Sequence, residues 1–124
     1  MPKISKDQAA QVEKTGGFEG HYGEIDDYTV GFENYTEDAD MAPLFKGLPD
    51  DRCQAPHWGY VIKGKVTYKY AEGEDVITAG EAYYAKPGHT PVIFAGTELV
   101  EFTPTEEMKK TVEVVMKNAQ SQGQ

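Results

Sequence analysis

Cys53 and His57 stand four positions apart, and residues of these two types can bind the same metal ion. A thiolate and an imidazole are both good ligands for zinc, iron or nickel, and the sulfur favours these ions over magnesium or calcium. Two ligands hold a metal ion poorly, so a third ligand must come from elsewhere in the chain. Each residue also has a simpler interpretation, as an inert buried cysteine or a hydrogen-bonded histidine.

The elements that must position these residues are short strands separated by turns. Alternating side chains predict a strand from Tyr28 to Glu33. Glycine and proline turns divide the later sequence into six more predicted strands: Trp58–Lys63, Lys65–Tyr70, Asp75–Thr78, Ala82–Ala85, Val92–Ala95 and Glu98–Phe102. Such close spacing predicts an antiparallel sandwich or barrel.

Two helices and one long loop complete the expected organisation. Ser5 suits the N-cap of a short helix that extends to about Glu13. The stretch from Glu37 to Arg52 matches no period and predicts a long ordered loop. A C-terminal helix over about 104–118, with Thr103 as its N-cap, is predicted by four apolar residues at helical spacing: Met108, Val112, Val115 and Met116.

The composition excludes several classes of function. The formal net charge of −9 opposes binding to nucleic acid or anionic lipid, since both need clustered lysine and arginine. The chain has neither a long apolar run nor a signal-like N-terminus, so we expect a soluble cytoplasmic protein. One cysteine excludes an internal disulfide. The motifs of serine hydrolases, P-loop enzymes and dinucleotide enzymes are missing.

Two segments carry a family resemblance, CQAPHWGYVIKG from Cys53 to Gly64 and AGEAYYAKPGHTP from Ala79 to Pro91. They resemble the two motifs of the cupin superfamily. The likeness is greater to small single-domain cupins with Cys-x3-His in the first motif and Pro-Gly-His in the second. With Gly64 as the glycine of the first motif, His57 stands at the position of the usual glutamate.

The resemblance covers about Tyr28 to Thr103 and implies an all-β fold, a double-stranded β-helix that forms a jelly-roll barrel. It also implies a homodimer, since such barrels are commonly dimeric, but no particular reaction. The expected organisation is an N-terminal arm over 1–27, the cupin barrel over 28–103, and a C-terminal helix and tail over 104–124.

Within such a barrel, His89 of the second motif is the expected third metal ligand. Strict counting puts Pro91 at the histidine position, but residues 89 and 91 share parity in an extended chain, so His89 can also face the interior. Cys53, His57 and His89 are then expected to hold one divalent transition metal ion, zinc, iron or nickel.

Glu101 and Tyr84 are the candidate catalytic residues. Glu101 alternates with Leu99 and Thr103, so it faces inward if they do and could then act as a base or a fourth ligand. The alternative is an exposed strand glutamate. Aromatic residues are expected either to form core or to line a substrate pocket, and the pocket set is Trp58, Tyr60, Tyr83 and Phe94.

The leading hypothesis is a metal-binding cupin whose pocket binds, and as an enzyme transforms, a small organic molecule. An enzyme of this kind would be a metal-dependent oxygenase, isomerase or lyase. The alternative is a metal-free ligand-binding or regulatory module without catalysis. A third interpretation is a dimeric scaffold with no chemistry in its interior.

Overall fold

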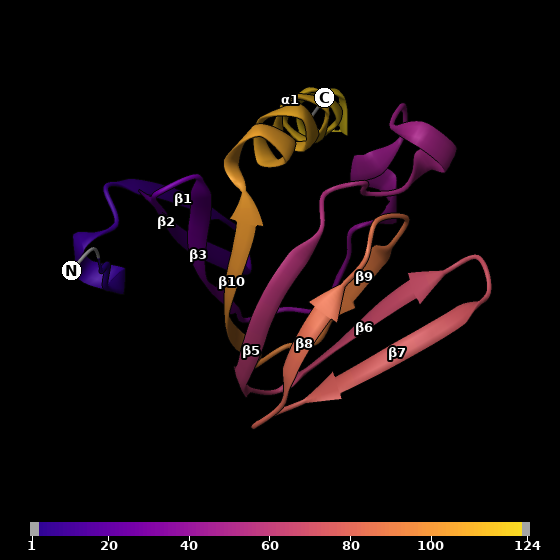
Figure 1. The fold of residues 1–124 in the computed structure, drawn as a ribbon. Coiled ribbons are helices and arrows are strands. Elements are labelled where there is room, and N and C mark those ends of the chain that lie inside the picture. Colours follow the sequence, from indigo (N-terminus) through magenta and orange to yellow (C-terminus); the bar gives the residue numbers. More distant parts are fainter. Residues whose placement is uncertain (1–2, 123–124) are drawn as a thin grey trace.

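The computed structural model describes residues 3–122, which form two antiparallel sheets and the C-terminal helix α1 (Thr105–Gln122) (Figure 1). The larger sheet has the order β1-β2-β3-β10-β5-β8 and the smaller sheet the order β4-β9-β6-β7. From β5 onward the chain crosses repeatedly between the sheets, so the sheets enclose a common interior. No helix within the described range is long and apolar enough to cross a membrane.

The strands are short and agree with the predicted ones to within two residues wherever a strand was predicted. The larger sheet consists of β1 (Gln11–Thr15), β2 (Phe18–Ile25), β3 (Tyr28–Tyr35), β10 (Glu98–Pro104), β5 (His57–Lys63) and β8 (Ala82–Ala85). The smaller sheet consists of β4 (Ala39–Asp40), β9 (Thr90–Ile93), β6 (Lys65–Tyr70) and β7 (Gly73–Thr78). The all-β prediction with a C-terminal helix is therefore confirmed.

The prediction of an N-terminal helix from Ser5 to Glu13 is wrong beyond the first turn of that helix. Ser5 does cap a helix, but this is one 3-10 turn, η1 (Lys6–Gln8). Residues 11–25 instead form β1 and β2, which extend the larger sheet beside β3. The turn at Gly16-Gly17 joins these two strands, and Gly17 has a φ of 83°, which favours glycine. The pairing of β1 with β2 outweighs the weak helical pattern.

The segment from Glu37 to Arg52 is ordered, as expected, and contains β4 and two 3-10 turns, η2 (Ala42–Phe45) and η3 (Pro49–Asp51). Helix α1 fixes this segment, because the Nδ2 of Asn118 donates to the carbonyl oxygens of Leu44 and Lys46 at 2.7 and 2.8 Å. The buried Phe45 packs with Cys53 and Ala55 against Val115 of α1.

Helix α1 begins at Thr105, so the prediction that Thr103 is its N-cap is wrong. Thr103 and Pro104 continue β10, and the backbone N–H of Thr105 donates to the carbonyl oxygen of Asp27 at 2.8 Å. The side chain of Thr103 is buried and is used for a different contact, described below. The end of the predicted tail, residues 123–124, lies outside the described residues.

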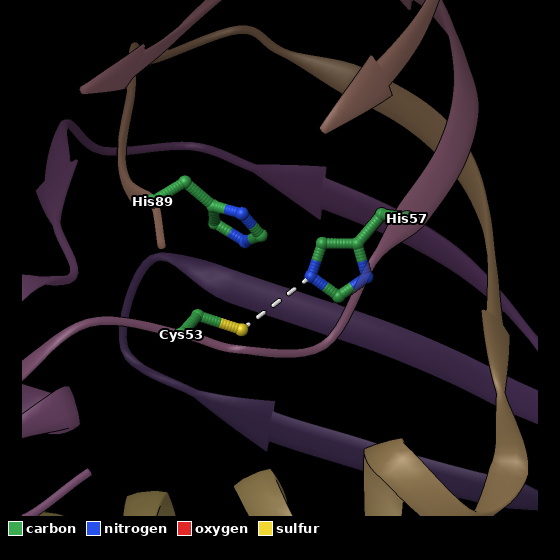
Figure 2. A group of neighbouring side chains, drawn as sticks. All are labelled: Cys53, His57 and His89. Atoms are coloured by element: carbon green, nitrogen blue, oxygen red, sulfur yellow. Dashed lines mark hydrogen bonds between the residues drawn. The ribbon is translucent and has the colours of Figure 1, made fainter. Parts of the chain in front are cut away.

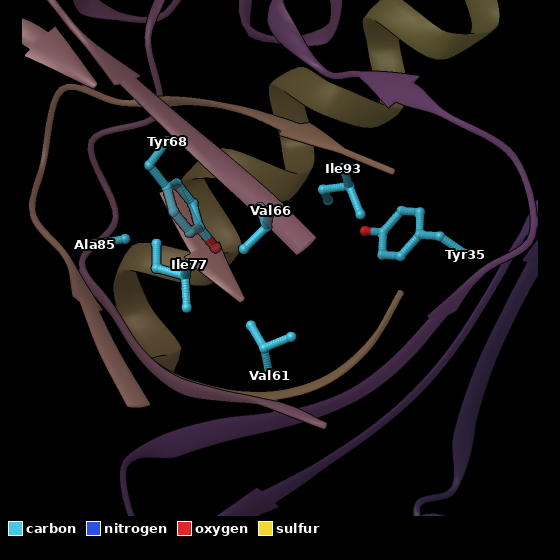
Figure 3. Close-up of a cluster of buried hydrophobic side chains, with 7 residues drawn as sticks. All are labelled: Tyr35, Val61, Val66, Tyr68, Ile77, Ala85 and Ile93. Carbon is cyan, nitrogen blue, oxygen red and sulfur yellow. The ribbon is translucent and has the colours of Figure 1, made fainter. Parts of the chain in front are cut away.

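The main hydrophobic core lies between the two sheets and receives side chains from both (Figure 3). Its buried members are Tyr35, Val61, Val66, Tyr68, Ile77, Ala85 and Ile93. Two of these are tyrosines, and their hydroxyl groups are donors that need partners once they are buried. The core therefore has to be continuous with a buried polar region.

One row of directly paired residues crosses the larger sheet and explains where the bulky side chains of this polar region fit. The row consists of Tyr22, Gly31, Glu101, Gly59 and Tyr83, one residue from each of five adjacent strands. A Cβ atom on Gly59 would lie 2.6 Å from the Cζ atom of Tyr83, and one on Gly31 would lie 2.7 Å from the Cε1 atom of Tyr22. Each tyrosine ring thus lies over a glycine.

We expect Gly59→Ala to lower the free energy of unfolding by about 1–3 kcal/mol, because the new methyl group would displace the ring of Tyr83. Gly16→Ala is the matched control, since nothing lies within 4 Å of its Cβ position, and its effect should stay within about 0.5 kcal/mol. Urea unfolding measures both values. Equal effects of the two variants would contradict the close approach at Gly59.

Candidate metal centre

The two motif segments are joined by their backbones at Cys53 and His89. The N–H of Cys53 donates to the carbonyl oxygen of His89 at 2.8 Å, and the N–H groups of Gly88 and His89 donate to the carbonyl oxygen of Cys53 at 2.8 and 3.2 Å. Gly88 has a φ of 94°, which allows the chain to turn into this bridge. Two candidate ligands are therefore held side by side by main-chain bonds.

His57, the first residue of β5, completes the cluster, and all three side chains point toward one another (Figure 2). The candidate ligand atoms of Cys53, His57 and His89 all lie within 4.8 Å of one another, and all three residues are buried. The Sγ atom of Cys53 is 3.7 Å from the Nε2 atom of His57. This is a set of soft and borderline ligands that could hold a metal ion.

The orientation of His89 leaves one ring nitrogen available for a ligand. Its Nδ1 atom donates to the carbonyl oxygen of Lys86 at 2.6 Å, which fixes the tautomer. Its Nε2 atom is the one buried side-chain nitrogen or oxygen without a hydrogen-bond partner among the described residues. Leaving a buried polar atom unpaired costs free energy, and a bound metal ion would remove that cost.

The other face of His57 contacts groups that orient it. Its Nδ1 atom lies 2.7 Å from the hydroxyl oxygen of Thr103 and 3.9 Å from the Oε2 atom of Glu101. Metal-binding histidines commonly use their second ring nitrogen in this way, which fixes the ring and raises the basicity of the ligand. The Nε2 atom of His57 therefore faces Cys53.

The pKa values of the cluster describe its state without a metal ion. Burial raises the pKa of the Cys53 thiol to about 11. Burial, together with the neighbouring His57, lowers the pKa of His89 to about 4. Near neutral pH the cluster thus contains a protonated thiol and a neutral His89. Metal binding would require the thiol to lose its proton.

The side chain of Glu101 faces the interior, on the same face of β10 as Leu99 and Thr103. Two tyrosine side chains donate hydrogen bonds to it. The hydroxyl groups of Tyr68 and Tyr83 are 2.7 and 2.6 Å from its Oε1 atom. Burial raises the pKa of Glu101, but the effect of His57 and these hydrogen bonds outweighs it, so the pKa lies below its ordinary value. Glu101 is therefore a largely buried carboxylate, with a side chain 13% exposed, beside the metal-ligand cluster.

A second carboxyl group, the half-buried Glu33, has a similar pair of tyrosines and was not identified from the sequence. The hydroxyl groups of Tyr22 and Tyr35 donate to Glu33 at 2.5 and 3.2 Å. Burial and the negative charge of Glu101 raise the pKa of Glu33 to about 7 against the lowering effect of these bonds. The signal in the sequence was Gly31, which marks the inward face of β3 that Glu33 shares.

Of the predicted pocket aromatics, the structure brings Tyr83 to the interior. Trp58 and Tyr60 lie on the outer face of the larger sheet with exposed fractions of 42 and 43%, and so does Tyr84, the second candidate catalytic residue, with 52%. The reason is strand alternation, because His57 faces inward and its neighbour Trp58 must then face outward. Tyr84 stacks on Trp58 at 5.0 Å between ring centroids, away from the ligands. Phe94 is half-buried under the Nζ atom of Lys65.

Comparisons with known proteins agree with this architecture of two facing antiparallel sheets around a shared interior. No family model matches the chain, and neither does any curated protein. An RmlC-like cupin from Shewanella frigidimarina matches with a TM-score of 0.55 and 14% identity, over 84% of this chain and 92% of that chain. KdgF from Halomonas sp. matches with a TM-score of 0.53 and 10% identity, over 84% and 94% of the two chains.

A third solved structure, Fe(II)-HppE with the alternative substrate (S)-1-HPP, matches with a TM-score of 0.56 and 11% identity over 83% of this chain and 60% of that chain. Identities this low show the fold alone. The fold and the site together define a class of protein: a two-sheet, jelly-roll-like β-protein with a buried Cys-His-His cluster. In particular, the chain has the cupin fold, which is the fold that the resemblance of its two motifs implies.

We expect Glu33→Gln to change the pH dependence of stability. The pKa of Glu33 in the folded protein is about 7, above the ordinary 4.5, so folding favours the protonated carboxyl group. This contribution to stability is complete below about pH 4.5 and is lost as the pH rises through 7. Wild-type unfolding free energy should therefore fall by roughly 2 kcal/mol relative to Glu33→Gln between about pH 5 and pH 8. Chemical denaturation at both pH values tests this, with the exposed Glu113→Gln as control. Parallel pH profiles for Glu33→Gln and wild type would refute it.

Proposed function

We propose that this chain is a metal-binding protein of cupin fold, in which Cys53, His57 and His89 hold one divalent transition metal ion and the interior binds a small organic molecule. The observation that carries the proposal is the buried, unpartnered Nε2 atom of His89, in a cluster whose candidate ligand atoms all lie within 4.8 Å of one another. A thiolate with two imidazoles suits zinc, iron or nickel. The Fe(II) form of the HppE structure supports iron as one candidate.

Three protein ligands leave coordination positions open for water or an organic ligand, as in catalytic rather than structural metal sites. When bound, the ion would act as a Lewis acid on an oxygen atom of the organic ligand. Thr103 keeps the Nδ1 atom of His57 occupied, so that Nε2 faces the metal position. Glu101 is the group that can accept a proton beside the site, and Tyr68 and Tyr83 hold its carboxylate in place.

Protein prepared without a histidine tag should contain close to one transition metal ion per chain by elemental analysis. Cys53→Ser and His89→Asn should lose the metal, because each removes one of only three ligands. His21→Asn is the control, since His21 pairs with Glu19 on β2 and lies outside the cluster. Metal-free wild type from cultures supplemented with zinc, iron and nickel would disprove the proposal.

Thr103→Val should weaken metal binding by about 10–100-fold, because the valine cannot hold the Nδ1 atom of His57. Competition with a chelator of known affinity measures the change. Thr67→Val is a matched control, as Thr67 is also a buried strand threonine but is not a partner in the side-chain hydrogen bonds of the three ligands. If the two variants bind metal equally well, Thr103 does not position His57.

A further inference from the structure

A cavity of about 820 Å³ lies outside the metal-ligand cluster, between helix α1, strands β1 to β3, and the segment around β4 and η2. Cys53, His57 and His89 are not among the residues that line it. Its volume falls within the range of about 300–1,000 Å³ that is typical of sites for small organic molecules. The cavity is therefore large enough for a ligand of its own.

Glu33 lies on the wall of this cavity together with Tyr22 and Tyr35. One tyrosine hydroxyl donates to each carboxylate oxygen, at 2.5 Å from Tyr22 to Oε2 and at 3.2 Å from Tyr35 to Oε1. A carboxylate oxygen can accept more than one hydrogen bond, so Glu33 is held in one orientation and keeps capacity for a further donor. A ligand in the cavity can supply that donor.

The charges around the cavity are strongly unequal. Five acidic residues line it, and Lys109 is the only basic residue among the lining residues. The acidic residues are Glu13, Glu24, Glu33, Glu37 and Asp38. A recess lined by one sign of charge concentrates the opposite charge and repels like charge. The ligand that complements this recess is a cation.

The wall formed by α1 and η2 is apolar. Val112 and Met116 of α1 are 38 and 46% exposed although they belong to the apolar stripe of the helix. The other apolar members of this wall are Met41, Leu44, Met108 and Val115. Methionine side chains adapt to irregular shapes, which suits a small-molecule site. A small inorganic cation would leave this wall in contact with water.

We propose that the cavity binds a small organic cation, an ammonium or amidinium group on an apolar body, with the cationic group paired to Glu33 and the apolar body against α1. The two tyrosine rings beside Glu33 add aromatic surface that also favours a cation. The argument uses none of the three metal ligands, so the site goes beyond the function proposed above and does not depend on it.

Calorimetric titration of the purified full chain with 2-phenylethylamine tests the proposal, with 2-phenylethanol as neutral and 3-phenylpropanoate as anionic counterparts. At about pH 8, where Glu33 is mostly ionised, the amine should bind about tenfold or more tightly than the alcohol, and the anion should not bind. Glu33→Gln should remove this preference for the amine. Glu113→Gln, on an exposed part of α1 outside the cavity, should keep it.

Val112→Trp is a second test that leaves Glu33 unchanged, because the larger side chain would fill the cavity from α1 and abolish amine binding. Equal binding of the amine and the alcohol, or amine binding that survives both Glu33→Gln and Val112→Trp, would overturn the proposal. The proposal would also be overturned if the wild type binds no amine and is a dimer that Val112→Trp converts to a monomer, because a second copy of the chain would then cover the cavity. Metal content measured on the same samples shows separately whether the metal centre is intact.

Discussion

The central constraint in this structure is the burial of a carboxylate inside a β-barrel. An ionised carboxylate loses much of its hydration in the interior and must be compensated by donors or positive charge. Glu101 receives hydrogen bonds from Tyr68 and Tyr83 and lies 3.9 Å from the ring of His57. These contacts link the larger sheet, the smaller sheet and the metal-ligand cluster, so the position of His57 depends on the same network that compensates Glu101.

The two carboxyl groups of the interior, Glu101 and Glu33, lie in different surroundings. Around Glu101 and the Cys-His-His cluster, side chains are buried and fixed by hydrogen bonds, which suits a site where atoms must be held accurately. Beside Glu33, the polar groups instead border an open cavity with a wall of methionine, leucine and valine. The two carboxyl groups thus differ in surroundings, and their pKa values shift in opposite directions.

Strand spacing and the two motifs were enough to predict the fold from the sequence. Turn residues mark strand ends locally, so the boundaries from Tyr28 onward required no knowledge of long-range contacts. Residues 11–25 were harder, because β1 is specified by pairing with β2 and β2 by pairing with β3, and their own side chains alternate only weakly.

The candidate site was predictable only in part. Cys53, His57 and His89 stood out because few other residue types bind transition metals. Which way an aromatic residue points depends on strand parity, and for β5 and β8 this becomes definite only once His57 and Tyr83 are known to face inward. Glu33, Tyr22 and Thr103 have ordinary sequence neighbours. Their importance arises from cross-strand contacts that a single sequence does not display.

The row of tyrosines lying over glycines has a consequence for how this sequence can change. At two places in the larger sheet, a ring on one strand occupies the space that a side chain on the next strand would need. The residue at each tyrosine position therefore restricts which residue can stand at the paired glycine position, although the two lie on different strands. Among relatives of this chain, we expect a side chain to replace Gly31 or Gly59 only where Tyr22 or Tyr83 has become smaller, so paired substitutions at these positions would trace the interior of the barrel.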